Sequence, residues 1–257
     1  MNKEQALNLS IIGVLKGALA ETSEHIKQLT VSLLLPATAL ALLGTFKHDI
    51  AAAIIISDVG FGLRGAKLLP VLVSGLFFVM YASTIHRVIV VPGERLPNRY
   101  GIYWTVRELK YFGYLAILTL ASYPVLALAS FAIELAGSSL FRGNTLATVS
   151  GALIVIVLVF YVLARASLAL PAIAAGNYPG FRKSWVLSQR NGWRLTIALT
   201  VSLVCVGVVT AIISQAFKLS GFYGRISSIL LALSEWVFYI FVLAVLSTAF
   251  SRLNSSQ

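Results

Sequence analysis

Six stretches of this chain are long and apolar enough to cross a lipid bilayer, and this feature limits its possible folds more than any other. A transmembrane helix needs about 20 mostly apolar residues to cross about 30 Å of hydrocarbon. The sequence therefore predicts an all-α, polytopic membrane helical bundle with six transmembrane helices. The predicted spans cover residues 29–46, 68–85, 112–135, 147–170, 195–217 and 226–250.

The composition supports a fold that is exposed to lipid. Of the 257 residues, 58% are hydrophobic and only 11% are charged, whereas a soluble domain carries about 25% charged residues. The apolar run at 154–160 does not alternate between apolar and polar residues, as the strands of a membrane β-barrel do. We expect one integral membrane domain over 1–257, with an N-terminal amphipathic segment at 1–28, the six spans within 29–250 and a short tail at 251–257.

The N-terminal segment permits two interpretations. Residues 1–20 have the layout of a signal peptide, with Lys3 before an apolar stretch and small residues at 18–20. Polar residues interrupt that stretch, however, and apolar residues recur every three to four positions through residue 29. This spacing favours an amphipathic helix over 11–29 that lies at the membrane interface.

A second segment is also ambiguous. Residues 51–56 are apolar but too few to cross a membrane, and Asp49 and Asp58 bound them. We interpret them as part of a loop or an interfacial helix, with a re-entrant segment as the alternative.

The distribution of positive charge predicts the orientation. The chain has 20 Lys and Arg against nine Asp and Glu, which gives a net charge of +11. Short loops rich in Lys and Arg stay in the cytoplasm, and the side that holds both termini takes all but six of these residues. Both termini are therefore predicted to be cytoplasmic. Topology and attraction to anionic lipid explain the excess charge, so we expect no nucleic-acid partner. The six Lys and Arg residues predicted on the opposite side of the membrane are Lys47, Arg64, Lys67, Arg142, Lys218 and Arg225.

The predicted layout repeats a unit of one amphipathic cytoplasmic helix followed by two spans. The three amphipathic interfacial helices are predicted at 11–29, 102–110 and 181–190. Residue identity between the units is low. An internal repeat and the ordinary occurrence of amphipathic helices beside membrane spans both fit this layout, and the six-span architecture holds under either.

The stretch between the fourth and fifth predicted spans carries the most specific pattern. It reads Arg-Ala-Ser-Leu-Ala-Leu-Pro over 165–171, Pro-Gly-Phe-Arg-Lys-Ser-Trp over 179–185 and Asn-Gly-Trp-Arg over 191–194. This pattern resembles a group of bacterial six-span inner-membrane proteins of unknown function, and the membrane domain fused to some glycerophosphoryl diester phosphodiesterases. The resemblance implies a multi-pass protein of the bacterial inner (plasma) membrane. No stretch outside the spans is long enough for the soluble phosphodiesterase barrel, so phosphodiesterase activity is not expected.

The sequence lacks the residue patterns of catalysis and metal binding. The three histidines, His25, His48 and His86, fall on opposite sides of the predicted membrane and cannot share one metal. The single cysteine, Cys205, excludes a disulfide within the chain and a cysteine zinc site. Neither a phosphate-binding loop nor an HExxH pair occurs. We therefore expect no cofactor, no metal and no enzymatic activity.

Two ionisable residues within predicted spans are candidates for an intramembrane polar site, because charged groups there are costly. Glu235 lies about nine residues into the sixth span, about 13 Å from its outer edge at 1.5 Å per residue, which is near mid-membrane. It could carry protons or contact a substrate, or it could hydrogen-bond a neighbouring helix. Arg165 lies near the inner end of the fourth span, where it reaches the interface or bonds to a loop.

Arg182, Lys183, Arg190 and Arg194 form a predicted cytoplasmic basic surface. It either anchors the chain through the preference of positive charge for the cytoplasm or binds the head groups of anionic phospholipids. The leading hypothesis is a non-enzymatic integral membrane protein that organises lipid or a partner protein complex. The alternative is a small transporter or transporter subunit with Glu235 on the translocation or proton path, and an intramembrane enzyme comes third.

Overall fold

The computed structural model describes residues 9–56, 62–91, 93–94, 96–97, 100–137, 145–177, 180–221 and 224–255, with backbone alone at 48, 51–56, 62–67, 125–126, 128–129, 131–137 and 145–152. These residues form α-helices and connecting segments with no β-strand among them, which confirms the all-α prediction. In chain order the helices are α2 (Ile11–Glu24), α3 (Ile26–Ile56), α4 (Gly62–Val90), α5 (Val106–Gly137), α6 (Thr145–Ser167), α7 (Ala169–Ala174), α8 (Gly180–Leu187), α9 (Gly192–Leu219) and α10 (Arg225–Ser255).

Five segments of these helices are long and apolar enough to cross a membrane: Ile26–Lys47, Leu68–Val90, Leu153–Ala174, Gly192–Leu219 and Arg225–Ser255. They overlap the first, second, fourth, fifth and sixth predicted spans. A helix satisfies its own backbone hydrogen bonds, which lipid cannot do, so the chain is a multi-pass membrane protein by the length and composition of its helices. The third predicted span, 112–135, lies within α5, a helix of 32 residues that is not one of the five. Six spans therefore stay a prediction.

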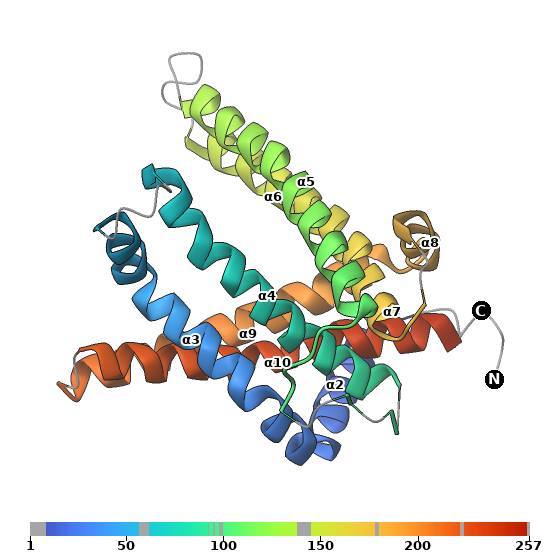
Figure 1. Ribbon diagram of the computed structural model, residues 1–257. Helices are drawn as coiled ribbons and strands as arrows, with labels where there is room; N and C mark the ends of the chain where they lie inside the picture. Colours follow the sequence, from blue (N-terminus) through green and yellow to red (C-terminus); the bar gives the residue numbers. More distant parts are fainter. Residues whose placement is uncertain are drawn as a thin grey trace.

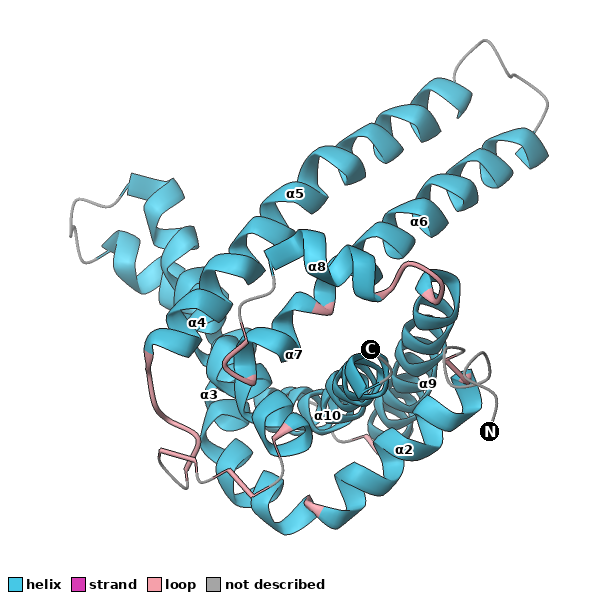
Figure 2. Ribbon diagram, turned by 90° about the vertical axis from the view of Figure 1, so that its right-hand side faces the viewer, coloured by secondary structure: helices cyan, strands magenta, loops and turns pink. Residues whose placement is uncertain are grey.

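The long helices pair into three hairpins, α3 with α4, α5 with α6, and α9 with α10. Figure 1 shows that these hairpins diverge from a common base. Within the base, α2 packs against α9 and α10, while α7 packs against α4 and α5. Figure 2 shows the α5–α6 hairpin standing apart from the others, with α8 beside its lower end.

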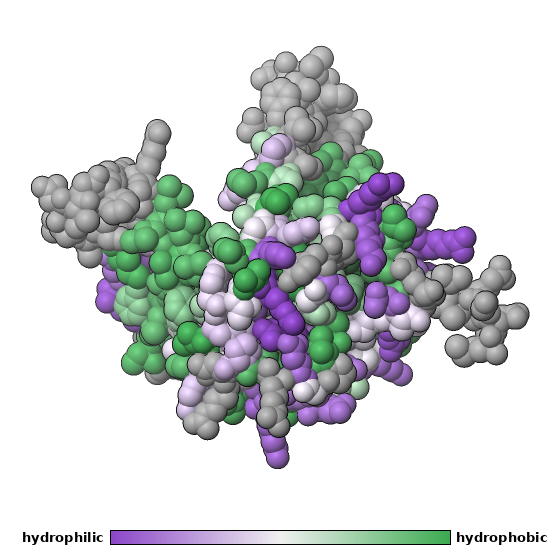
Figure 3. Space-filling view, turned by 45° about the vertical axis from the view of Figure 1, so that its right-hand side comes forward, coloured by the Kyte–Doolittle hydropathy of each residue, from purple (hydrophilic) through white to green (hydrophobic). Residues whose placement is uncertain are grey.

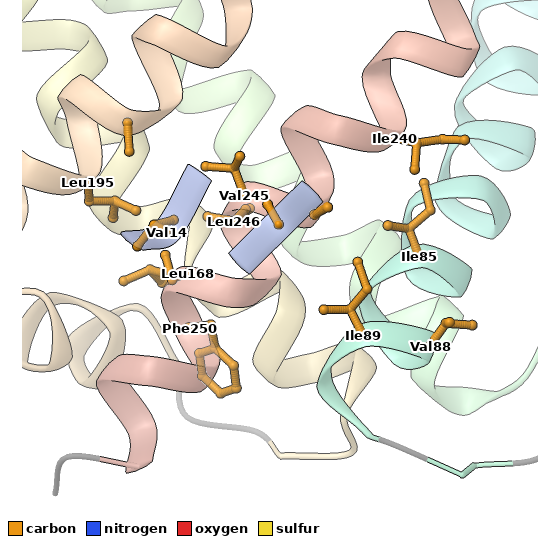
Figure 4. Close-up of a cluster of buried hydrophobic side chains, with 14 of the residues drawn as sticks. Val14, Ile85, Val88, Ile89, Leu168, Leu195, Ile240, Val245, Leu246 and Phe250 are labelled. Carbon is orange, nitrogen blue, oxygen red and sulfur yellow. The ribbon is translucent and has the colours of Figure 1, made fainter. Parts of the chain in front are cut away.

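Burial is concentrated where the hairpins meet. The buried residues of α10 all lie in its second half, from Ile240 to Leu253, and this helix contacts α2, α3, α4, α7 and α9. Figure 4 shows side chains of α10 surrounded by residues from distant parts of the chain. The labelled members include Val245, Leu246 and Phe250 of α10 with Val14, Ile85, Ile89, Leu168 and Leu195. Because hydrophobic burial is the main favourable term in folding, the base is the part that holds the three hairpins together.

The outer parts of the hairpins expose apolar side chains. The last buried residue of α9 is Val206, and Val208, Ile212 and Leu219 beyond it are 54%, 63% and 88% exposed. In the space-filling view, hydrophobic residues gather over the diverging hairpins and hydrophilic residues lie around the base (Figure 3). Such apolar surface suits lipid as its solvent, in agreement with the candidate spans.

The three predicted amphipathic helices differ from the structure in their bounds. The first, predicted at 11–29, ends at Glu24, and α3 begins at Ile26 after a break at His25. The third, predicted at 181–190, is the separate helix α8, which ends at Leu187.

The prediction of a separate helix at 102–110 is wrong. Residues 102–105 are not helical, and α5 begins at Val106 and continues without a break. Gly101 precedes this segment with φ +68°, and a Cβ atom there would lie 1.9 Å from the Ser32 carbonyl oxygen. The close approach to α3 holds the chain in a non-helical conformation until residue 105.

Two other segments are more helical than predicted. The loop interpretation of 51–56 is wrong, because α3 continues through Ile56, although the side chains there lie outside the described residues. The predicted tail at 251–257 is helical through Ser255, because α10 extends that far.

Candidate functional site

Arg165 joins α6 to α8 at the base of the α5–α6 hairpin. Its side chain is 5% exposed. Nε donates to Ser188 Oγ at 2.9 Å, Nη1 donates to Tyr161 Oη at 3.0 Å, and Nη2 donates to the Trp185 carbonyl at 2.6 Å. The guanidinium also lies over the Trp185 ring, with 3.7 Å between Cζ and the ring centroid. The hydrogen bonds and the aromatic face both offset the cost of burying this cation.

Local sequence explains why α8 ends beside Arg165. The Ser188 hydroxyl donates to the Ser184 carbonyl at 2.9 Å, which closes the last turn of α8. The chain then turns through residues 188–191 before α9 begins at Gly192. A Cβ atom at Gly192 would lie 2.8 Å from the Tyr161 ring, so glycine permits close contact between α9 and α6. Of the two expected arrangements for Arg165, the structure shows bonding within the chain, to the end of α8 and the turn that follows it.

An apolar groove of about 540 Å³ lies between α5 and α6 and ends at α8. Ile117 and Ala121 belong to its α5 wall, and Val155 and Val162 belong to its α6 wall. Phe181 and Trp185 of α8 line the groove at its base. The Phe181 ring packs against Tyr114 of α5 with 4.9 Å between centroids, and the Trp185 ring packs against Tyr161 of α6 with 6.4 Å between centroids. Aromatic contacts therefore attach α8 to both helices of the hairpin.

The predicted basic surface is divided in the structure. Arg182 and Lys183 are exposed on α8, and Arg190 is exposed in the turn after it. Arg194 is less exposed, and its Nη1 donates to the Leu9 carbonyl at 3.4 Å. Three of the four residues are therefore available to a ligand, while Arg194 contacts the segment before α2.

Glu235 lies in a different part of the molecule from Arg165. It is half-buried on α10 and lines a cleft of about 380 Å³ between α9 and α10. Thr210 and Ser214 of α9 and Tyr239 of α10 line the same cleft. The two candidates thus belong to separate hairpins and do not form one polar site.

A partly buried ionic cluster, which the sequence did not reveal, lies at the junction of α4 and α5. Arg87 donates to Glu94 Oε1 at 2.7 Å and to Glu108 Oε1 at 3.3 Å, and Arg107 donates to the same Glu94 oxygen at 2.8 Å. Glu108 is fully buried. Its Oε2 accepts from the Thr105 backbone N–H at 3.0 Å and from the Thr105 hydroxyl. The Thr105 hydroxyl oxygen in turn accepts from the Arg107 backbone N–H at 3.2 Å. These contacts cap the start of α5 in the manner of a capping box, so the Thr-x-x-Glu spacing at 105–108 was a usable signal.

Tyr103 completes this cluster. Its hydroxyl lies 2.9 Å from Thr84 Oγ1, and its ring lies 5.3 Å from Arg87 Cζ. Burial raises the pKa of the Tyr103 phenol, although the Thr84 hydrogen bond and the Arg87 charge oppose this shift. The phenol therefore stays protonated at neutral pH and can act as a hydrogen-bond donor.

His86 and Ser247 form a hydrogen-bonded pair that joins α4 to α10. His86 Nδ1 lies 2.7 Å from Ser247 Oγ, and the Ser247 hydroxyl donates to the Leu243 carbonyl at 2.9 Å. With the serine proton used in this way, the imidazole Nδ1–H is the donor in the pair. Both residues are 0% exposed, so the pair is a buried contact that joins the two helices.

Glu21, Glu24 and His25 form a group whose potential ligand atoms lie within 4.8 Å of one another, at the end of α2. These residues are exposed or half-exposed, and Glu21 lies 4.0 Å from His25 as an i,i+4 pair. Exposed acidic groups of this kind occur commonly without a metal. Of the other two histidines, His86 is buried in the base, and the His48 side chain lies outside the described residues.

The chain matches no protein-family model, and neither curated proteins nor solved structures give a significant match to it.

Proposed function

We propose that the chain is a non-enzymatic, six-span protein of the bacterial inner membrane that binds anionic phospholipid on its cytoplasmic side. The observation that carries this proposal is α8, a short helix between two candidate spans that exposes Arg182 and Lys183 beside a half-exposed Trp185. Basic and aromatic residues on a short amphipathic helix suit the membrane interface. Each Lys or Arg there contributes about 1 kcal/mol of attraction to an anionic surface.

The sequence around α8 contains no acidic residue that could neutralise this charge. No Asp or Glu occurs between Glu134 and Glu235. Arg182, Lys183 and Arg190 are all exposed in this segment, and Arg182 directly follows Phe181 at the base of the apolar groove. The resemblance to bacterial six-span inner-membrane proteins, which rests on residues 165–194, supports the same location and topology.

Native mass spectrometry of the protein in mild detergent tests this function. We expect the protein to retain phosphatidylglycerol in preference to phosphatidylcholine, and R182Q/K183Q to lose this preference. The control K27Q/K47Q removes the same amount of charge at two exposed positions on α3 and keeps the preference. Equal retention of both lipids by the unaltered protein would contradict the proposal.

The cleft at Glu235 supports a second candidate function, a small transporter or transporter subunit. A carboxyl group and hydroxyl side chains line this cleft within two candidate spans, and a polar route through a membrane requires such groups. Proton flux into proteoliposomes that is lost in E235Q but kept in E24Q, which alters an exposed residue of α2, would support this candidate. Absence of flux in the unaltered protein would remove the proton-path form of it.

A further inference from the structure

We infer that the groove between α5 and α6 holds one acyl chain of a membrane phospholipid whose phosphate group lies at Arg182. The inference rests on the proposed function and adds to it a defined site for the lipid tail. It is carried by the dimensions of the groove, the aromatic residues at its base and the charge beside that base.

The groove has the length of one membrane leaflet. Along α6 it extends from Val155 to Ala166, eleven residues that rise about 17 Å at 1.5 Å per residue. This is slightly more than half of the roughly 30 Å hydrocarbon core of a bilayer. The volume of about 540 Å³ falls within the range of roughly 300–1,000 Å³ that is usual for small-ligand sites. A single chain that enters from the α8 side therefore fits the groove.

The base of the groove is held in place before any ligand arrives. Arg165 hydrogen-bonds the Trp185 carbonyl and covers the Trp185 ring, and Phe181 packs against Tyr114. These contacts restrain α8 against both helices of the hairpin. A site with restrained walls loses less conformational entropy on binding, which distinguishes it from an ordinary lipid-facing helix surface.

The charge beside the groove complements a phosphate. Phe181 and Trp185 face the groove, and Arg182 directly follows Phe181 and is exposed beside the base of the groove. Lys183 lies on another side of α8, near Ala172 and Asn254. Arg182 forms no ion pair or hydrogen bond with another residue that the structure describes. Arg and Lys both bind phosphate oxygens. An apolar groove that ends beside an exposed cation matches a phospholipid, in which an apolar tail is joined to a phosphate.

Trp185 provides a direct reporter of a chain in the groove. We would replace Trp104, Trp193 and Trp236 by Phe, which leaves Trp185 as the only tryptophan. This parent is titrated in mild detergent with phosphatidylglycerol that carries brominated acyl chains, because bromine quenches nearby indole fluorescence. We expect saturable quenching of Trp185, and the same titration with brominated phosphatidylcholine measures the preference for the head group.

Variants that fill the groove test the position of the chain. A121F narrows it from α5 and V162F narrows it from α6, so misfolding of one variant leaves the other as a test. Both are expected to lose the saturable quenching. The control L120F adds an aromatic ring at a position of α5 that is 67% exposed and outside the groove wall, and it keeps the quenching. Thermal midpoints of all variants are compared with that of the parent.

The outcomes separate the inference from the proposed function. Quenching that survives in both A121F and V162F overturns the groove as the acyl-chain site, even if phosphatidylglycerol is still preferred. A second outcome is that A121F and V162F both abolish the quenching, while the quenching of the parent is equal for the two lipids and is unaffected by R182Q/K183Q. This outcome supports a chain in the groove. The same outcome overturns the phosphate contact and the proposed selectivity for anionic lipid.

Discussion

The guanidinium of Arg165 covers the Trp185 ring at 3.7 Å and also donates to the Trp185 carbonyl at 2.6 Å. One side chain at the end of α6 thus fixes both the ring and the backbone of α8. Because Trp185 lines the groove, Arg165 is a positioning residue for the candidate site and does not itself line it.

Replacement of Arg165 by Gln is expected to destabilise the protein by about 3 kcal/mol, the upper net value for a hydrogen bond to a charged group. R165K keeps the charge but loses the planar fork that reaches three acceptors. Its stability is therefore expected to fall between those of R165Q and the parent protein. Denaturant titration in mild detergent measures these changes. R182Q on the exposed face of α8 is the matched control, with a change within about 0.5 kcal/mol. An R165K variant as stable as the parent would show that the fork geometry is unimportant.

The capping box at the start of α5 gives a second prediction. E108A removes the partner of the Thr105 N–H and of Arg87 inside the protein, and buried groups left unsatisfied cost about 1–3 kcal/mol each. We expect E108A to lose about 3 kcal/mol of stability. E108Q loses less, because glutamine also closes a capping box, although it removes the charge that faces Arg87.

The exposed Glu24 on α2 supplies the control for this pair. E24Q is expected to change the free energy of unfolding by no more than about 0.5 kcal/mol. Equal effects of E108Q and E108A would mean that the Arg87 ion pair, and not the cap, accounts for the contribution of Glu108.

Gly101 and Gly93 allow backbone strain and close contact to be measured separately. Both have positive φ, at +68° and +78°, but a Cβ atom at Gly101 would lie 1.9 Å from the Ser32 carbonyl oxygen, whereas one at Gly93 meets nothing within 4 Å. G93A is expected to cost about 1–2 kcal/mol, the usual penalty of the left-handed region. G101A adds displacement of α3 to that penalty, so we expect a much larger loss of stability. Similar thermal midpoints for the two variants would contradict the close contact.

The long helices could be predicted from the sequence because an apolar run is a local property. Five predicted spans overlap the five candidate spans. The error at 102–110 has a different origin. The spacing there suggested a complete surface helix, but a long-range contact between Gly101 and Ser32 and a cap at Thr105 delay the helix to Val106.

The candidate site was only partly accessible to sequence reasoning. Arg182 and Lys183 were found from local charge, and Trp185 belonged to the pattern at 179–185. The groove itself could not be predicted, because its α5 wall precedes α8 by about 60 residues and depends on how the hairpins pack. In the same way, the pairing of Arg87 with Glu108 joins two helices across a turn and leaves no periodic signal.

Cysteine labelling tests the six-span topology and the depth of α9. Cys205 is exposed within the candidate span Gly192–Leu219, about 20 Å from Gly192 at 1.5 Å per residue. Because a charged, water-soluble maleimide is disfavoured in lipid, it is expected to leave Cys205 unmodified in intact cells and in permeabilised ones.

Two introduced cysteines on a C205S background then report the sides of the membrane. Ser139 lies between α5 and α6 in the sequence, and Arg190 lies between α8 and α9. If α5 crosses the membrane and both termini are cytoplasmic, S139C reacts in intact cells, whereas R190C reacts only after permeabilisation. Reaction of both cysteines under the same condition would place them on one side. The α5–α6 hairpin would then not cross the membrane, and its groove could not extend through a leaflet from α8.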